Sequence, residues 1–304
     1  MTVVSTPSVR GELTGARTLP SAAHRPRGHR WASALIWYAV AIVAFGIFVL
    51  PFALLLLAVF KSPAQAAATP AQYWPHPFTV AGFRVLFGPS VNIVHYFLNS
   101  VLVAVGTAVG TCIVALLGGY GLVRFPFRGS GVIFVAILTI LMVPFQSIIT
   151  PLYVVLDHVH LVNSLVGLGL VYITYQLPFG LFVMRNSFAS VPTAIAEAAE
   201  MDGASPMQSL LHAQLPLVLP GILTVAIFAF IAAWNDFIAA LILLSSQSKF
   251  TLPIILLDLV TGQFGVIQWG VLEAGVLISM VPCLLIFLAL QRYYMGGLLS
   301  GAVK

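Results

Sequence analysis

Residues 197–204, with the sequence EAAEMDGA, lie in a polar stretch between two long apolar segments. Good helix formers and small alanines fill residues 193–201, and the turn signal Asp202-Gly203 follows them. The segment SPMQ, residues 205–208, has the pattern of a capping box that begins a second helix, which Pro216 is expected to end. The stretch therefore predicts two short helices joined at a glycine and exposed to water between two membrane spans.

The composition places these helices in a membrane protein. Hydrophobic residues make up 60% of the 304-residue chain and charged residues only 7%, with a mean hydropathy of +1.06. A soluble domain of this length could not bury so much apolar surface. We therefore expect an all-α integral membrane protein.

Hydropathy predicts six transmembrane helices. Each segment holds about 20 or more mostly apolar residues, enough to cross a hydrocarbon core about 30 Å thick. Gly106 and Gly110 give the second span a small-residue face for close helix packing. The predicted spans are residues 31–60, 97–123, 131–153, 163–185, 215–245 and 270–294, with the polar loop over 190–214 between the fourth and the fifth.

The basic residues predict the orientation of the spans. Residues 1–30 carry five arginines and are expected to form a disordered cytoplasmic tail ahead of a transmembrane domain over 31–304. A cleaved signal peptide is the alternative for the tail, but the apolar run over 31–60 is far too long for one. With the N-terminus inside, ten of the 13 Lys and Arg residues are cytoplasmic, and Lys61, Arg84 and Lys249 are outside. Both termini and the loop over 190–214 are therefore predicted to be cytoplasmic.

The sequence contains no motif for chemistry on this chain. A GxxxxGK[ST] phosphate loop is absent, so any ATP must be bound elsewhere. Cys112 and Cys283 lie in separate apolar runs and are expected to be core residues. Residues 157–160, with two histidines and an aspartate, come nearest to a metal site and are expected to be a solvated loop. We therefore expect no catalytic residue, metal or cofactor on this chain.

The loop over 190–214 resembles the EAA loop of ATP-binding-cassette (ABC) importer permeases, through which a separate ATPase drives the membrane subunit. The family form is EAA, three residues, G, nine residues and IxLP. Ala213 stands where the family has isoleucine, and an ordinary interfacial hairpin is the alternative to a coupling loop. The resemblance assigns ATPase coupling to the residues that match, which are Glu197, Ala198, Ala199, Gly203, Leu215 and Pro216. The neighbouring Asp202 is assigned the same role.

The resemblance extends over residues 31–304. Within the superfamily, the chain is similar to the carbohydrate-uptake permeases, in particular the maltose-type second permease subunit. Residues 234–237 in the fifth span, WNDF, and residues 301–304 at the end, GAVK, carry it best. The chain departs from the family pattern at Gly121, where alanine is usual, at Gly296, where arginine is usual, and at Glu273, where an apolar residue is usual.

This resemblance implies a type I ABC importer permease fold and a transport subunit that is not an enzyme. It implies three partners in a bacterial inner or plasma membrane: a second homologous permease as heterodimer partner, a cytoplasmic ATPase dimer that holds ATP and Mg²⁺, and an extracytoplasmic solute-binding protein. Membrane lipid surrounds the chain, and nucleic acid is not expected as a partner. The expected cargo is a sugar or oligosaccharide. A glycerol phosphate conjugate, a polyamine or an amino acid is the alternative, and the spans hold too few ionisable groups for an ion-coupled carrier or a membrane enzyme.

Four side chains are candidates for the translocation path, because polar groups inside a span face the protein interior or a water-filled path. Trp234, Asn235 and Asp236 are adjacent in the fifth predicted span, and Trp234 could stack on a sugar face. Contacts between spans are the alternative role for Asn235 and Asp236. Glu273 could line the path, pair with a cation on the partner permease, or reach the outer interface near the start of the sixth predicted span.

Overall fold

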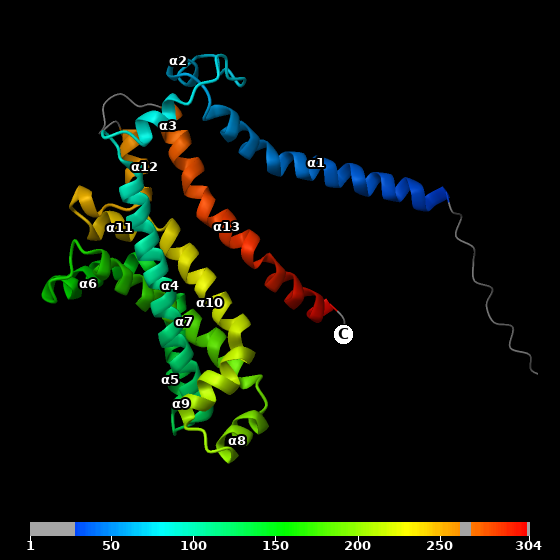
Figure 1. Ribbon diagram of the computed structural model, residues 1–304, viewed down its shortest axis with the longest axis vertical. Helices are drawn as coiled ribbons and strands as arrows, with labels where there is room; N and C mark the ends of the chain where they lie inside the picture. Colours follow the sequence, from blue (N-terminus) through cyan, green and yellow to red (C-terminus); the bar gives the residue numbers. More distant parts are fainter. Residues whose placement is uncertain (1–27, 262–268, 303–304) are drawn as a thin grey trace, which may run out of the picture. The chain divides into compact units, whose positions relative to one another are not determined.

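The computed structural model describes residues 28–261 and 269–302, and within these ranges all regular structure is helical (Figure 1). The N-terminal unit ends at Phe52 within α1, and the second unit begins at Ala53. The elements are α1 (Gly28–Ala58), α2 (Pro63–Ala66), α3 (Ala81–Leu86), α4 (Ile93–Arg124), α5 (Ser130–Thr139), η1 (Ile140–Met142), α6 (Phe145–His158), α7 (Leu165–Ala189), α8 (Thr193–Met201), α9 (Pro206–Gln208), η2 (Ser209–Gln214), α10 (Leu215–Asn235), α11 (Ile238–Leu243), η3 (Gln247–Lys249), α12 (Leu252–Thr261) and α13 (Trp269–Ala302).

Five helices among the described residues are long and apolar enough to cross a membrane, and a bent pair brings the number to six if it counts as one span. All-α membrane architecture, predicted from hydropathy, is thereby confirmed. In the second unit, Figure 1 shows α8 and α9 at one end and α3 and α12 at the other. The five helices are Ala34–Ala58, Ile93–Arg124, Leu165–Ala189, Pro206–Asn235 and Trp269–Ala289. The expected tail over 1–30 lies almost wholly outside the described residues.

The third expected span, residues 131–153, is bent sharply rather than straight. Ser130–Met142 and Phe145–His158 meet at 107°. The bend occurs at Pro144, the N-cap residue of α6. Val143 before it has φ −85° and ψ 123°, the extended conformation that a following proline favours. A proline inside a hydrophobic run therefore breaks the helix here.

The fifth expected span, residues 215–245, divides at Asp236. α10 ends at Asn235, and Asp236 is extended with φ −70° and ψ 135°. Its Oδ2 accepts the backbone N–H of Ala239 at 3.0 Å and that of Ala240 at 3.4 Å, both in the first turn of the short helix α11. An aspartate that bonds its own following backbone competes with continuation of the helix.

Glycines bring α4 and α7 close together. A Cβ at Gly119 would lie 2.7 Å from the Cβ of Met184 and 2.9 Å from the backbone nitrogen of Arg185. Such a contact is possible only because glycine has no side chain, and it allows helices to pack closely in a membrane. Gly110, from the expected small-residue face, contacts the end of the flexible Ile173 side chain of α7 instead of its backbone.

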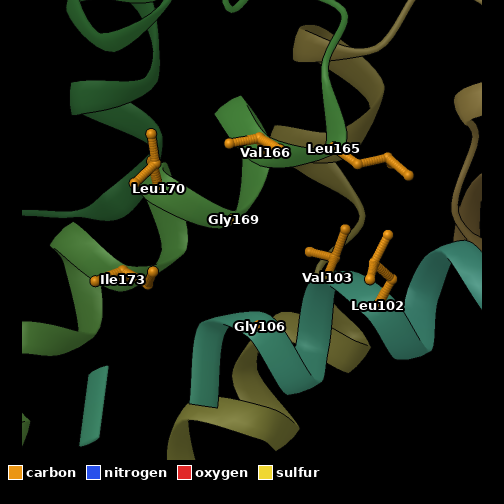
Figure 2. A pocket seen from close by; sticks show the side chains of 8 residues that line it. All are labelled: Leu102, Val103, Gly106, Leu165, Val166, Gly169, Leu170 and Ile173. Atoms are coloured by element: carbon orange, nitrogen blue, oxygen red, sulfur yellow. The ribbon is translucent and has the colours of Figure 1, made fainter. Parts of the chain in front are cut away.

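Gly106 lies apart from this tight contact. It lines an apolar groove between α4 and α7, and Gly169 of α7 lines the same groove (Figure 2). Among the described residues, no atom lies within 4 Å of a Cβ built at Gly106. The predicted small-residue face therefore has one member in helix packing and one in an open groove. The groove is lined by Leu102, Val103, Gly106, Leu165, Val166, Gly169, Leu170 and Ile173.

Candidate functional site

The loop over 190–214 forms a two-armed knob that turns at Gly203. α8 covers Thr193–Met201, as the sequence predicts. Gly203 has φ +80°, a left-handed conformation that glycine adopts without strain, and its N–H donates to the carbonyl of Glu200 at 3.0 Å. The turn therefore depends on glycine for its backbone conformation.

The second arm begins with the expected capping box. The Gln208 N–H donates to Ser205 Oγ at 3.4 Å, and the Ser205 N–H donates to Gln208 Oε1 at 2.8 Å. Pro206 occupies the first turn, where its missing N–H has no cost. Both halves of this local sequence signal are present in the structure.

The prediction that Pro216 ends the second arm is wrong, because Pro206–Asn235 is one continuous helix. Ser209–Gln214 is a π turn, in which the N–H of Leu215 donates to the carbonyl of Leu210. Proline lacks the N–H of a regular α-helical ladder and clashes with the preceding turn, and the wider π turn relieves that clash. The knob is therefore continuous with the span α10, which Leu215 and Pro216 begin.

The tip of the knob is open to a partner. Met201 is 88% exposed and lies outside the apolar spans. Within α8, Ala196 is buried and Ala199 is half-buried, so this arm has a small apolar inner face. The tip thus presents small, acidic and flexible apolar side chains together. Its exposed residues are Glu197, Ala198, Glu200, Met201, Asp202 and Gly203.

The base of the knob is fixed to the spans. Leu210 of the π turn is fully buried in a cluster with Tyr120 of α4 and Phe188 of α7. The Tyr120 hydroxyl donates to the carbonyl of Pro206 at 3.0 Å. The exposed tip is consequently carried on a base that packs against two membrane helices.

A second polar site surrounds Asp236, where α10 breaks. The Tyr172 hydroxyl of α7 donates to Asp236 Oδ2 at 2.7 Å. Tyr175 and Gln176 of the same helix lie in this pocket, and no hydrogen bond among the described residues involves either side chain. The rings of Phe145 and Tyr175 lie 4.5 Å apart. The pocket is lined by Phe145, Tyr172, Tyr175, Gln176, Ala232 and Asp236.

These groups have the chemistry that hydroxyl-rich ligands require. An amide both donates and accepts hydrogen bonds, a carboxylate accepts them, and a phenol does either. Aromatic rings beside such groups supply an apolar surface. The pocket therefore places hydrogen-bonding groups beside an apolar surface, which is the combination that a hydroxyl-bearing ligand needs.

Trp234 does not line this pocket. It is only 3% exposed, and its indole N–H donates to the carbonyl of Ser279 on α13 at 3.0 Å. Its ring lies 5.5 Å from that of Phe97 and is stacked on that of Phe230 at 5.7 Å. Trp234 thus packs between helices in this conformation, and the expected stacking on a sugar has no exposed ring face here.

Asn235 and Glu273 also lie away from the residues that line the pocket. The Asn235 amide is exposed and donates to the carbonyl of Ile231 in its own helix at 2.8 Å. Glu273 lies on α13, and its Oε2 is buried with no hydrogen-bond partner among the described residues. Lys61 is close enough for its charge to act on this carboxylate. Of the four path candidates, the structure therefore places only Asp236 in the pocket.

Sequence reasoning missed the α7 side of the pocket. Tyr172, Tyr175 and Gln176 recur on one stretch of a hydrophobic span just before Pro178. Polar side chains inside a span are the signal that could have drawn attention to them. Among residues 34–261 and 269–289, no group of three or more His, Cys, Asp or Glu side chains could hold a metal ion.

The sequence matches a known protein family and proteins of known function. Residues 110–295 match the family described as binding-protein-dependent transport system inner membrane component. The diacetylchitobiose uptake system permease protein NgcG of Streptomyces coelicolor is 31% identical over 289 residues, which cover 95% of this chain and 93% of that protein. The trehalose transport system permease protein SugB of Mycobacterium tuberculosis is 33% identical over 207 residues, which cover 68% of this chain and 76% of that protein.

A similar fold occurs in a solved structure. A chain of a bacterial ABC transporter involved in the import of the acidic polysaccharide alginate superimposes with a TM-score of 0.75 at 21% identity. The superposition covers 89% of this chain and 99% of that chain. The two chains therefore share one helical fold.

Proposed function

This chain belongs to the binding-protein-dependent transport system inner membrane components, and we propose that it passes a sugar or oligosaccharide through the membrane as one permease of an ATP-driven importer. The observation that carries the proposal is the exposed knob that continues without a break into the span α10. Such a knob can transmit movement of a cytoplasmic partner directly to the membrane helices. The chain is a translocation subunit, and ATP hydrolysis belongs to a partner.

The proposed assembly has four kinds of component. A second homologous permease completes the path, and an ATPase dimer on the cytoplasmic side binds ATP and Mg²⁺. A solute-binding protein delivers cargo from outside the bacterial cell membrane. Closure of the ATPases on ATP moves the knobs, and the spans then alternate between outward-facing and inward-facing arrangements. The exposed acids Glu197 and Asp202 are suited to basic groups on the ATPase surface.

Two observations support a sugar as the cargo. The relatives NgcG and SugB are named for uptake of diacetylchitobiose and trehalose. The pocket at Asp236 combines hydroxyl-binding groups with aromatic rings and has a single carboxylate. A polyamine would favour several acids, and an amino acid or a phosphate conjugate would favour a cation in the pocket. The residues that line the pocket include neither a second acid nor a cation.

Uptake by cells tests the cargo. A strain lacking this chain is expected to lose uptake of one or more radiolabelled saccharides, with trehalose and diacetylchitobiose as the first probes, and to regain it with the wild-type chain. Spermidine, glycerol 3-phosphate and a mixture of amino acids serve as non-sugar probes. Loss of uptake of one of these, with every saccharide taken up normally, would contradict the proposed cargo.

The topology is tested with single cysteines. In a background without Cys112 and Cys283, cysteine at Val159 or Ser248 should react with a membrane-impermeant maleimide in intact cells. Cysteine at Met201, which is 88% exposed, should react only after the cells are opened. We expect this pattern because the distribution of Lys and Arg predicts a cytoplasmic knob. The reverse labelling pattern would show that the orientation is wrong.

The pocket is tested with Gln176→Leu and Asp236→Asn. Each change weakens a hydrogen bond to the cargo, so we expect the KM for uptake to rise about tenfold, since such a bond is worth about 1.5 kcal/mol. Asparagine still accepts from Tyr172 and from the first turn of α11, and Gln176 has no hydrogen-bond partner among the described residues, so folding should persist. Asn235→Ala is the matched control outside the pocket. Equal KM values for all three variants and the wild type would show that the pocket does not bind the cargo.

A further inference from the structure

Three polar side chains connect the end of α4 with the π turn at the base of the knob. Arg124 Nε donates to Gln214 Oε1 at 2.9 Å, and Gln214 Nε2 donates to Ser209 Oγ at 3.1 Å. Gln214 is 0% exposed and Ser209 is 3% exposed. Water cannot replace either bond at such a buried amide. Gln214 therefore ties together two elements that are 90 residues apart in the sequence.

A second contact joins the same two elements. Tyr120 lies one turn before Arg124 on α4 and bonds the carbonyl of Pro206. Its ring packs against that of Phe188 at 5.5 Å. The last turn of α4 thus holds the segment 206–214 at both of its ends, by Tyr120 at the start and by Arg124 at the finish.

The segment held in this way includes a part of the helix Pro206–Asn235 where bending is easy. The π turn over Ser209–Gln214 has a less favourable geometry than an α-helix. Pro216 lies two residues after it and has no N–H to donate. Kinks in helices form at prolines and π turns. Movement of the knob tip would therefore be lost as bending at this point unless the turn were braced.

We propose that Gln214 is this brace, a positioning residue that makes the knob, the end of α4 and the span α10 move as one body. The inference rests on the proposed function, because it concerns how movement of the ATPase reaches the spans. Among the described residues, Gln214 is the one hydrogen-bond partner of the Arg124 guanidinium, and Arg124 Nη2 is buried without an acceptor. The guanidinium therefore depends on the Gln214 amide, which in turn holds Ser209.

The test replaces the polar link by an apolar one. Arg124→Met with Gln214→Leu removes both bonds and leaves no unpaired buried cation, so the spans should still assemble. Gln214→Glu is the conservative variant, because it keeps an acceptor for Arg124. Ser209→Ala breaks the link at its other end and serves if the double variant does not assemble.

The brace is measured as a distance in the complete importer in lipid nanodiscs. Spin labels at Met201→Cys on the knob and Phe127→Cys after α4 report the separation, without and with ATP and vanadate, in a background without Cys112 and Cys283. We expect one narrow, unchanged distance in the wild type and in Gln214→Glu. In the double variant and in Ser209→Ala we expect a broadened distribution that shifts further with nucleotide, while ATP is still hydrolysed.

The outcomes separate the brace from the proposed function. The brace would be overturned if the double variant and Ser209→Ala both gave a distance distribution as narrow as that of the wild type. It would also be overturned if the distribution in Gln214→Glu were as broad as that in the double variant. Failure of the wild-type complex to hydrolyse ATP would instead contradict the proposed function. In that case the label-to-label distances measured without nucleotide would still show whether Gln214 holds the knob against α4. A merely structural role would lower the amount of assembled complex without a nucleotide-dependent shift.

Discussion

Gly203→Leu is expected to abolish transport while the spans still insert and fold. Gly203 has φ +80°, a conformation that costs leucine about 1 kcal/mol or more. Among the described residues, no atom lies within 4 Å of a Cβ at this position, so backbone conformation and bulk at the tip decide the effect. The displaced knob should associate weakly with the ATPase, and uptake together with solute-stimulated ATP hydrolysis measures this.

Two further variants at the same position separate the causes. Asparagine adopts the left-handed conformation more readily than other residues, so Gly203→Asn should keep part of the transport activity. Gly203→Ala adds little bulk but disfavours the conformation, and should fall between Asn and Leu. Full transport by purified complex carrying Gly203→Leu would refute the role of the knob.

Gly119→Ala is expected to reduce the stability of the transmembrane domain strongly. The added Cβ would lie 2.7 Å from the Cβ of Met184 and 2.9 Å from the nitrogen of Arg185, where the α7 backbone cannot yield locally. Overpacking of this kind costs about 1–3 kcal/mol, more than the 0.5–1 kcal/mol or so that alanine gains over glycine in a helix. Thermal unfolding of the detergent-purified chain measures the loss.

Matched controls lie on the same helix. At Gly106 and Gly121 no described atom lies within 4 Å of an added Cβ, so Gly106→Ala and Gly121→Ala should be neutral or slightly stabilising. Equal melting temperatures for Gly119→Ala and these two controls would show that α4 and α7 are not packed as described.

Local signals in the sequence predicted local structure well. The extent of α8, the left-handed turn at Gly203 and the capping box from Ser205 depend on contacts within a few residues. The hydrophobic spans likewise follow from segment composition, because each helix satisfies its own backbone hydrogen bonds in lipid.

Breaks in the helices were harder to predict. Pro144 breaks its helix, whereas Pro178 lies inside the long helix α7. The same residue type thus has different outcomes, since the surrounding helices determine whether freed carbonyls are covered. Asp236 could have faced a neighbouring span or bonded the first turn of a new helix, and only the fold shows that it does both.

Contacts between distant segments were outside the reach of single-sequence reasoning. The pocket at Asp236 combines side chains of α6, α7 and α10. The link from Arg124 to Gln214 spans 90 residues and gives no local pattern. Trp234 was a reasonable candidate for the path because of its chemistry, but helix packing buries it.

Cross-linking tests the central claim, that the knob is the surface on which the ATPase acts, most directly. Met201 lies at the tip of the knob and is 88% exposed, so Met201→Cys is the test position, and Val159→Cys at the end after α6 is the control. Membranes containing the complete importer, with Cys112 and Cys283 replaced, are treated with a short bismaleimide. We expect Met201→Cys to form a covalent product with the ATPase, in a yield that changes with ATP. A product formed with the ATPase at Val159→Cys and not at Met201→Cys would contradict the claim.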